Sequence, residues 1–219
     1  MNIYSIKEKF RNLISPYILN ICSFFLTNKK LNPVVIASSG RSGSTFLFKS
    51  IVKSYSKITG INKQITIQHA FNLKKKSFLY NGVYKSHDFP NKNIKDVKYI
   101  FIYGDPISSL NSTLLRTSRD GYSWLKLHLE HLKSTNNIRD FYNSDILNYE
   151  ALLKEWKEFE KKYPRNVLTI DFEKLWIDHA IIEDFLGIKF YLGKKKNRKS
   201  DNNYKENKIL NKLKHIYKG

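Results

Sequence analysis

The stretch that decides the fold covers residues 34–47 and reads Val34-Val35-Ile36-Ala37-Ser38-Ser39-Gly40-Arg41-Ser42-Gly43-Ser44-Thr45-Phe46-Leu47. The apolar run 33–38 predicts a buried strand, and the pattern over 44–55 predicts a helix. Between them, Gly40 and Gly43 can adopt positive φ angles, which lets successive N–H groups converge on an anion. The stretch therefore predicts a strand, an anion-binding loop and a helix, in that order.

Side chains in and after the loop strengthen this interpretation. The N-terminal end of the helix is positive, and Ser44 and Thr45 add hydroxyl donors. The planar guanidinium of Arg41 fits a pair of phosphate or sulfate oxygens. The alternative is an ordinary Ser/Gly turn that caps a helix, which explains neither the strand nor the arginine. A Walker loop, which binds ATP with Mg²⁺, has a lysine after its second glycine, where this chain has Ser44.

The rest of the chain alternates between strand and helix patterns. Apolar runs predict strands at 97–103 and 166–170, with weaker candidates at 65–67 and 82–85. Helical patterns cover 106–117, 146–160 and 173–186, and a short amphipathic helix is expected in the basic tail 194–219. This alternation predicts a three-layer α/β/α fold with a mostly parallel central sheet, which resembles that of the P-loop nucleotide hydrolases.

The composition limits the partners that the chain can have. Its 219 residues suffice for one α/β domain, and Lys and Arg (39) outnumber Asp and Glu (19), for a net charge of +20. This charge favours anionic partners such as nucleotides, acidic glycans, nucleic acid or an anionic membrane, although a general bias toward Lys, Asn and Ile contributes to it. Cys22 is the only cysteine, which excludes an intrachain disulfide and a cysteine-based zinc site and fits a cytoplasmic location.

Residues 1–32 are expected to form an amphipathic lead-in helix that packs on the domain formed by 33–219. The apolar run 12–27 is interrupted by Pro16 and Asn20, and it is shorter than the roughly 20 apolar residues that a membrane-spanning helix needs. Basic residues precede the run, as in a signal peptide, but no clear cleavage site follows. The alternative is peripheral membrane contact through apolar side chains of this run, namely Tyr17, Ile18, Phe24 and Phe25.

The strand, the Ser-Gly-Arg-Ser-Gly-Ser-Thr loop and the aromatic residue after it resemble the 5′-phosphosulfate loop of one family. This family is the sulfotransferases that use 3′-phosphoadenosine 5′-phosphosulfate (PAPS). The resemblance implies that the 5′-phosphate is held by residues 41–45, namely Arg41, Ser42, Gly43, Ser44 and Thr45. It also implies that Arg41 reaches the transferred sulfonate and that Phe46 stacks on the adenine.

The tripeptide Lys85-Ser86-His87 resembles the Lys-Thr-His of the same family, in which the histidine is the general base. A neutral imidazole can accept the proton of a hydroxyl nucleophile, and Lys85 could stabilise the bridging oxygen of the leaving phosphate. The alternative is that His87 is a structural residue at the end of a strand. His69 and Asp88 are the other candidate bases.

The segment 101–112 resembles the 3′-phosphate element of the family, in which a strand ends in Arg-Asp/Asn-Pro and a serine follows eight residues after the arginine. Asp105, Pro106 and Ser112 match this pattern, but Gly104 stands where the family has its arginine. Either of two arginines further along, Arg116 or Arg119, could take its place. Asp105 is interpreted as the N-cap of the helix that Pro106 begins.

Later segments match the family in order. Phe172, after the strand predicted at 166–170, stands where some members have an aromatic residue that contacts adenine, and 182–187 resembles a Phe-Leu-Gly helix end. Arg198 and Lys199 resemble the Arg-Lys-Gly element that closes over the 3′-phosphate, although by composition they could belong to a solvated tail. The stretch 119–143 contains Tyr122, Trp124, His128 and His131, and it either lines the acceptor side or forms a core helix.

Together these features predict an enzyme that transfers the sulfonate of PAPS to a hydroxyl of a carbohydrate or other acceptor, which could itself be acidic. The resemblance implies no metal, and no nucleic-acid partner is expected. Two alternatives remain. A P-loop nucleotide kinase or NTPase-like protein would depend on Mg²⁺, and a non-catalytic polyanion-binding protein would use the charge of +20 and would be steeply salt-dependent.

Overall fold

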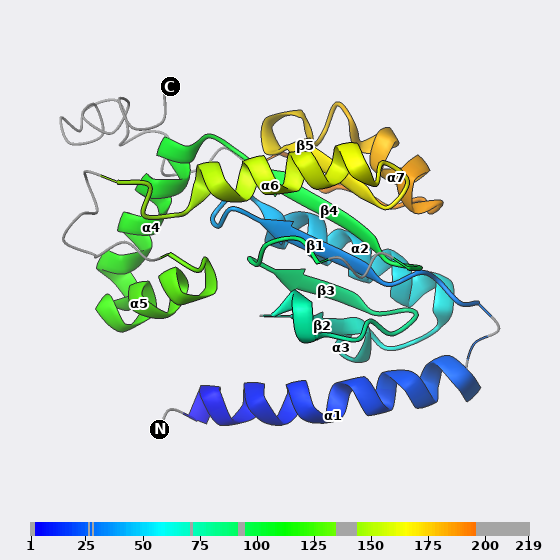
Figure 1. Cartoon of the computed structure of the whole chain (residues 1–219). Helices are drawn as coiled ribbons and strands as arrows, with labels where there is room; N and C mark the ends of the chain where they lie inside the picture. Colours follow the sequence, from blue (N-terminus) through cyan, green and yellow to red (C-terminus); the bar gives the residue numbers. More distant parts are fainter. Residues whose placement is uncertain are drawn as a thin grey trace.

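The computed structural model describes residues 3–25, 27, 29–70, 72–91, 95–134 and 144–195. In this part of the chain, five parallel strands form one sheet in the order β2-β3-β1-β4-β5 (Figure 1). The strands are β1 Val34–Ser38, β2 Ile67–His69, β3 Val83–Ser86, β4 Lys98–Tyr103 and β5 Val167–Asp171. The mostly parallel sheet predicted from the sequence is confirmed.

The central strand β1 pairs with β3 along one edge and with β4 along the other, and apolar cores cover both of its faces. Its register places Val34 opposite both Val83 and Lys98. Alternate residues of β1 enter two separate cores, with Val35 in one core and Ile36 in the other. Burial on both faces explains why β1 reads as a continuous apolar run and not as an alternating one.

Helices cover the two faces of the sheet. On one face, α2 (Ser44–Thr59) packs Leu47 and Ile51 against the strands, and α7 (His179–Leu186) adds Ile182. On the other face, α6 (Tyr149–Lys162) packs Trp156 against Phe101, together with α4 (Pro106–Asp120) and α5 (Tyr122–His131). Figure 1 shows α6 in front of the sheet and α2 behind it. The arrangement is the predicted three-layer α/β/α fold.

Helix α1 (Ile3–Phe25) lies along the edge of the molecule next to β2 and the short helix α3 (Lys63–Thr66) (Figure 1). It buries Leu19 and Cys22 against Ile61, which forms a third and smaller apolar cluster. It is longer than the run 12–27 that marked it in the sequence, and it contains Pro16. Within the described residues, no helix has both the length and the apolar character required to cross a membrane.

Two sequence predictions differ from the structure. Ile65 and Thr66 were expected in a strand, but they end α3, and β2 begins at Ile67. The side chain of Asn62 accepts a hydrogen bond from the N–H of Gln64 and so starts this short helix. The helix predicted at 173–186 is interrupted, because the 3₁₀ turn η3 (Phe172–Lys174) precedes α7. A second 3₁₀ turn is η1 (Leu73–Lys75), and the predicted tail helix lies outside the described residues.

Replacing Trp156 by alanine should destabilise the fold. The side chain is fully buried, stacks on Phe101 with ring centroids 5.4 Å apart, and donates from Nε1 to the Asp88 carbonyl at 3.2 Å. The expected loss is about 3–5 kcal/mol in the free energy of unfolding, measured by urea titration. Lys154→Ala, an exposed position on the same helix, should change stability by no more than about 0.5 kcal/mol. Equal effects of the two substitutions would contradict this account of the core.

Candidate active site

The loop between β1 and α2 has an unusual backbone. Gly40, Arg41 and Gly43 all have positive φ angles, of 79°, 51° and 81°. Gly43 is the N-cap of α2, and no side chain caps the helix there. A Cβ atom on Gly43 would lie 2.1 Å from the ring of Phe172, so only glycine fits. The loop therefore turns tightly into the helix and brings the positive end of α2 to the carboxyl edge of the sheet.

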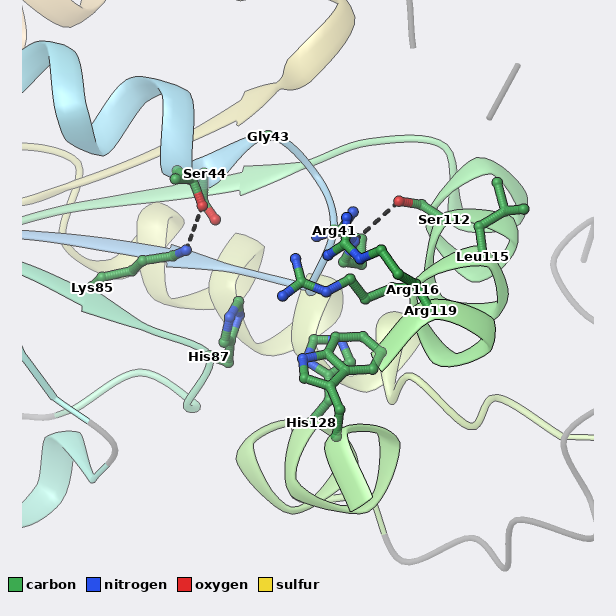
Figure 2. Close-up of a pocket in the computed structure, with 12 residues that line it drawn as sticks. Arg41, Gly43, Ser44, Lys85, His87, Ser112, Leu115, Arg116, Arg119 and His128 are labelled. Atoms are coloured by element: carbon green, nitrogen blue, oxygen red, sulfur yellow. Dashed lines mark hydrogen bonds between the residues drawn. The ribbon is translucent and has the colours of Figure 1, made fainter. Parts of the chain in front are cut away.

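A pocket of about 600 Å³ opens at this edge (Figure 2). Four cationic side chains line it, and the described residues contribute no carboxylate to its lining. A pocket with this charge suits a ligand that carries more than one negative group. Its lining residues are Arg41, Gly43, Ser44, Thr45, Lys85, His87, Ser112, Leu115, Arg116, Arg119, Trp124 and His128.

His87 is held in one orientation by the end of β1. Its Nδ1 atom lies 3.0 Å from the Ser38 carbonyl oxygen and 3.1 Å from the Ser38 hydroxyl, which in turn donates to Ser44 Oγ at 2.9 Å. A carbonyl oxygen can only accept, so Nδ1 must carry the proton. The lone pair of the neutral ring is therefore on Nε2, the arrangement that a general base needs.

The environment keeps the imidazoles of the pocket neutral. Burial lowers the pKa of His87 from 6.5 to about 4, with a further decrease from the positive charge of Lys85. Burial also lowers the pKa of His128 to about 3, and the neighbouring His87 adds to this shift. The two rings meet edge to face with centroids 5.8 Å apart. At neutral pH both rings can therefore accept a proton.

Lys85 approaches the start of α2 from β3. Its Nζ donates to Thr45 Oγ1 at 2.6 Å. Burial lowers the pKa of Lys85, and the charges of Arg41 and Lys49 lower it further. The ammonium group is thus placed beside the helix N-terminus among other cations, a position that a bound anion would stabilise.

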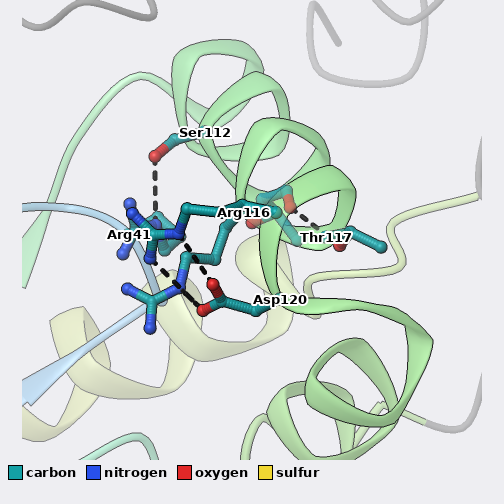
Figure 3. A network of polar contacts seen from close by, with 7 residues as sticks. Arg41, Ser112, Arg116, Thr117 and Asp120 are labelled. Atoms are coloured by element: carbon teal, nitrogen blue, oxygen red, sulfur yellow. Dashed lines mark hydrogen bonds and ion pairs between the residues drawn. The ribbon is translucent and has the colours of Figure 1, made fainter.

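The opposite wall of the pocket is the helix α4. Arg41 donates from Nε to Ser112 Oγ at 3.0 Å and so links the loop to α4 (Figure 3). Arg116 and Arg119 both bind Asp120, and these contacts, led by the hydrogen bond from Arg119, lower the pKa of Asp120 to about 2. Figure 2 shows Arg116 and Arg119 converging on Arg41, with Lys85 and His87 on the facing side. The pocket therefore has cationic groups on two walls.

Gly104, which stands where the resembled family has an arginine, is buried beside the loop. A Cβ atom there would meet Ser42 and Phe172 at 3.6 Å, which is ordinary van der Waals contact. Its carbonyl accepts a hydrogen bond from the Tyr149 hydroxyl at 2.7 Å. The arginines that reach the pocket come instead from the loop and from α4, as proposed for Arg116 and Arg119 from the sequence.

Most of the residues singled out in the sequence meet in this pocket, but three with assigned roles do not line it. The Ser42 hydroxyl is buried and donates to the Ile102 carbonyl at 3.1 Å. Phe46 packs on Trp176 with ring centroids 5.3 Å apart, and Phe172 packs on the same Trp176 and on Gly43. The Ser42 hydroxyl thus points into the fold and the two phenylalanines pack beside the loop, and the assigned contacts of all three residues with PAPS stay predictions.

The remaining candidates divide into three groups. Arg198, Lys199 and the side chain of His69 lie outside what the structure describes. Asp88 accepts from the N–H groups of Leu73 and Phe89, both at 2.9 Å, so its carboxylate is engaged in the backbone of its own loop. Asp105 accepts from the Ser108 N–H at 2.6 Å, and the predicted N-cap of α4 is confirmed.

Sequence reasoning overlooked Trp176, which joins Phe46 to Phe172 on the outer side of the loop and donates to the Gly193 carbonyl at 2.8 Å. Its position four residues after Phe172 was the available signal. The role of Leu115 was also missed, because a leucine at helical spacing is indistinguishable from a core residue until the helix is placed.

No protein-family model and no curated protein matches this chain. Among solved structures, the chain is similar to retinol dehydratase in a complex with retinol and PAP, with a TM-score of 0.50 and 17% identity. That match covers 80% of this chain and 66% of the other, so the chain spans just under two thirds of its length. The mouse sulfotransferase SULT7A1 complexed with PAP is similar at a TM-score of 0.41 and 16% identity, over 92% of this chain and 70% of that one.

A sulfotransferase from Alicyclobacillus acidocaldarius is similar at a TM-score of 0.39 and 11% identity, over 86% of this chain and 96% of that one. The likeness to retinol dehydratase establishes the fold: the chain shares the α/β/α architecture of a protein that binds PAP. One fold can serve many functions, so the function of this chain depends on the residues of its own pocket.

The two imidazoles should make the fold sensitive to acid. In the unfolded chain each histidine titrates near 6.5, whereas in the fold the pKa values of His87 and His128 are about 4 and about 3. Below pH 6.5 the unfolded state binds more protons, so the free energy of unfolding should fall as the pH decreases toward 4, by at most about 1.4 kcal/mol per pH unit for each histidine. Urea titrations at several pH values measure this slope.

His128→Gln should make that slope shallower, because one of the two groups is removed. His179→Gln, which replaces a histidine that does not line the pocket, serves as the matched control and should leave the slope as it is. A slope that His128→Gln leaves unchanged would show that the ring does not have the low pKa described above.

Proposed function

We propose that this chain is a PAPS-dependent sulfotransferase that transfers the sulfonate group to an acceptor hydroxyl. The observation that carries the proposal is the placement of His87 Nε2, the base-competent atom, in a cationic pocket at the N-terminus of α2. The loop amides, Arg41 and Lys85 would hold the 5′-phosphosulfate, and Ser112, to which Arg41 donates, would hold a second anionic group. The likeness of fold to a PAP complex supports this assignment, since PAP is what remains of PAPS after transfer.

The proposed reaction is an in-line displacement at sulfur. The acceptor oxygen forms a bond to sulfur while the bond from sulfur to the bridging oxygen of the 5′-phosphate breaks, and PAP leaves. His87 Nε2 takes the proton of the acceptor hydroxyl. Lys85 and Arg41 balance the charge that grows on the bridging and sulfonate oxygens. No oxidation or reduction is involved.

The proposed acceptor is a carbohydrate hydroxyl. Among the twelve side chains and backbone segments that line the pocket, only Leu115 and Trp124 are large and apolar. An apolar alcohol could pack on these two side chains but would leave the polar groups without hydrogen bonds to the ligand, whereas a sugar could hydrogen-bond to the polar groups and stack on the indole. The cationic walls would also accept an acidic sugar. The proposed location is the cytoplasm, on the basis of the single cysteine.

The direct test is transfer of labelled sulfonate from PAPS to a panel of neutral and acidic sugars, with retinol included as an apolar alcohol. His87→Ala should lower kcat by about 10²–10⁴-fold, because a general base contributes that much. Arg41→Ala should lower kcat/KM for PAPS. His179→Ala, a histidine that does not line the pocket, is the matched control and should retain activity.

If transfer survives His87→Ala, His87 is not the general base. If retinol is the only acceptor in the panel, the proposed carbohydrate acceptor is wrong. If ATP with Mg²⁺ raises the melting temperature and PAPS does not, the nucleotide-kinase alternative replaces this proposal. Binding of polyanions that is steeply salt-dependent, unaffected by His87→Ala and without any transfer, would favour the non-catalytic alternative.

Gly104→Arg should strengthen the binding of PAP. The glycine does not require a positive φ, and a Cβ atom there makes only ordinary contacts, so an arginine can be introduced without strain at its base. A new charge-assisted hydrogen bond is worth about 1.5–3 kcal/mol, which corresponds to an increase of roughly 10- to 100-fold in affinity. Calorimetric titration with PAP measures this gain.

Two comparisons make this test specific. Gly104→Met adds a side chain of similar length without charge and should not strengthen binding. Titration with 5′-AMP, which lacks the 3′-phosphate, should show no gain for Gly104→Arg. An equal gain for 5′-AMP would mean that position 104 does not face the 3′-phosphate.

A further inference from the structure

Helix α1 presents a row of large apolar side chains to solvent. Tyr17, Ile18, Ile21, Phe24 and Phe25 are between 39% and 76% exposed. At about 100° per residue, these five positions fall within a sector of about 120° on one face of the helix. Among the described elements in Figure 1, none lies beyond α1 on its outer side. These five residues are called the outer face of α1.

The opposite face of α1 is smaller and more polar, and it is the face that docks on the domain. Ser15 Oγ accepts from Gln68 Nε2 at 2.6 Å, and Ser23 Oγ accepts from Asn81 Nδ2 at 3.1 Å and donates to the Tyr80 carbonyl at 3.3 Å. Leu19 and Cys22 are buried between these serines. Hydrogen bonds at Ser15 and Ser23 thus fix the rotation of the helix about its axis.

Burial of apolar surface within one chain would favour the opposite orientation of α1, with its aromatic side chains against the domain. Turning α1 by half a turn would bury three aromatic rings, which is favourable, and would expose two serines. The chain instead holds Tyr17, Phe24 and Phe25 outward with buried hydrogen bonds at Ser15 and Ser23. The described part of the chain leaves the outer face uncovered, as expected if an apolar environment outside the chain covers it.

The charge of the segment indicates what that environment is. Residues 1–32 contain five basic residues and one acidic residue. Lys29 and Lys30, just after the helix, are exposed, and so is Lys63 on α3, which packs on α1. If a second copy of the chain covered the outer face in a symmetric dimer, the two basic segments would face each other and repel, and each chain carries a net charge of +20. The surroundings of the outer face therefore match an anionic surface with an apolar interior.

We propose that α1 lies in the plane of an anionic lipid membrane, with its outer face inserted at the level of the headgroups and its lysines on lipid phosphates. Phenylalanine and tyrosine side chains suit this interface, and basic residues add electrostatic attraction. In the sequence, the same spacing of three or four residues continues toward the N-terminus at Ile3, Ile6, Phe10 and Ile14. The proposal does not depend on the reaction that the pocket performs.

Vesicle flotation of the full chain tests this proposal. The protein should float with vesicles of phosphatidylcholine that contain phosphatidylglycerol, and much less with phosphatidylcholine alone. Phe24→Ser with Phe25→Ser should weaken binding at least about tenfold, because two aromatic rings leave the interface. Lys29→Glu with Lys30→Glu, or high salt, should also weaken it.

Matched control variants distinguish membrane binding through the outer face of α1 from nonspecific adsorption to vesicles. Ile177→Ser with Tyr191→Ser removes two side chains that are 80% and 69% exposed elsewhere, and Lys154→Glu with Lys161→Glu reverses two exposed charges on α6. Both control variants should bind vesicles like the parent chain. All the substituted side chains are exposed, so melting curves should remain unchanged.

Three results would overturn the proposal. The first is the absence of binding to anionic vesicles, and the second is binding that the phenylalanine substitutions leave intact. The third is a dimer, detected by light scattering, that dissociates when the two phenylalanines are replaced. A second copy of the chain would then cover the outer face.

Discussion

The backbone of Gly43 lies directly against the ring of Phe172, and this contact determines how β1 turns into α2. With positive φ angles at Gly40, Arg41 and Gly43, the loop bends sharply enough to point the start of α2 at the pocket and the side chain of Arg41 at α4. The same turn places Ser44 beside Ser38, which in turn orients His87. The position of the α2 N-terminus at the pocket, the tautomer of His87 and the link to α4 all depend on this one close approach.

The pocket carries an excess of positive charge, which an anionic ligand would neutralise. Burial lowers the pKa of Lys85, His87 and His128, and neighbouring positive charges lower them further. No described residue forms a hydrogen bond with His128 Nε2, although the ring is only 8% exposed. Asp120 offsets part of the charge of two arginines, but it does not line the pocket. Such a site is costly when empty and favourable when an anion enters, as expected for ligand selection by charge.

The outer face of α1 shows a second departure from maximal burial, at the other side of the fold. In both places the chain gives up stability within itself, as a surface does that binds an outside partner; under the two proposals these partners are a polyanionic nucleotide and a lipid surface. The two features are separate in structure, because α1 contacts β2 and α3, whereas the pocket is built from the loop before α2, the start of α2, the end of β3, α4 and α5. An acceptor drawn from the membrane would connect them.

The sequence by itself determined the α/β/α fold, because buried parallel strands read as continuous apolar runs, and it determined the loop, because glycines and hydroxyls at that spacing have few other uses. Asp105 was recognised as a cap from its place before Pro106. Only the tertiary structure decided that Asp88 is engaged by backbone N–H groups, that the Ser42 hydroxyl turns inward and that Trp124 and His128 reach the pocket. Those outcomes depend on which way a side chain points once distant elements are packed, and local sequence does not specify that direction.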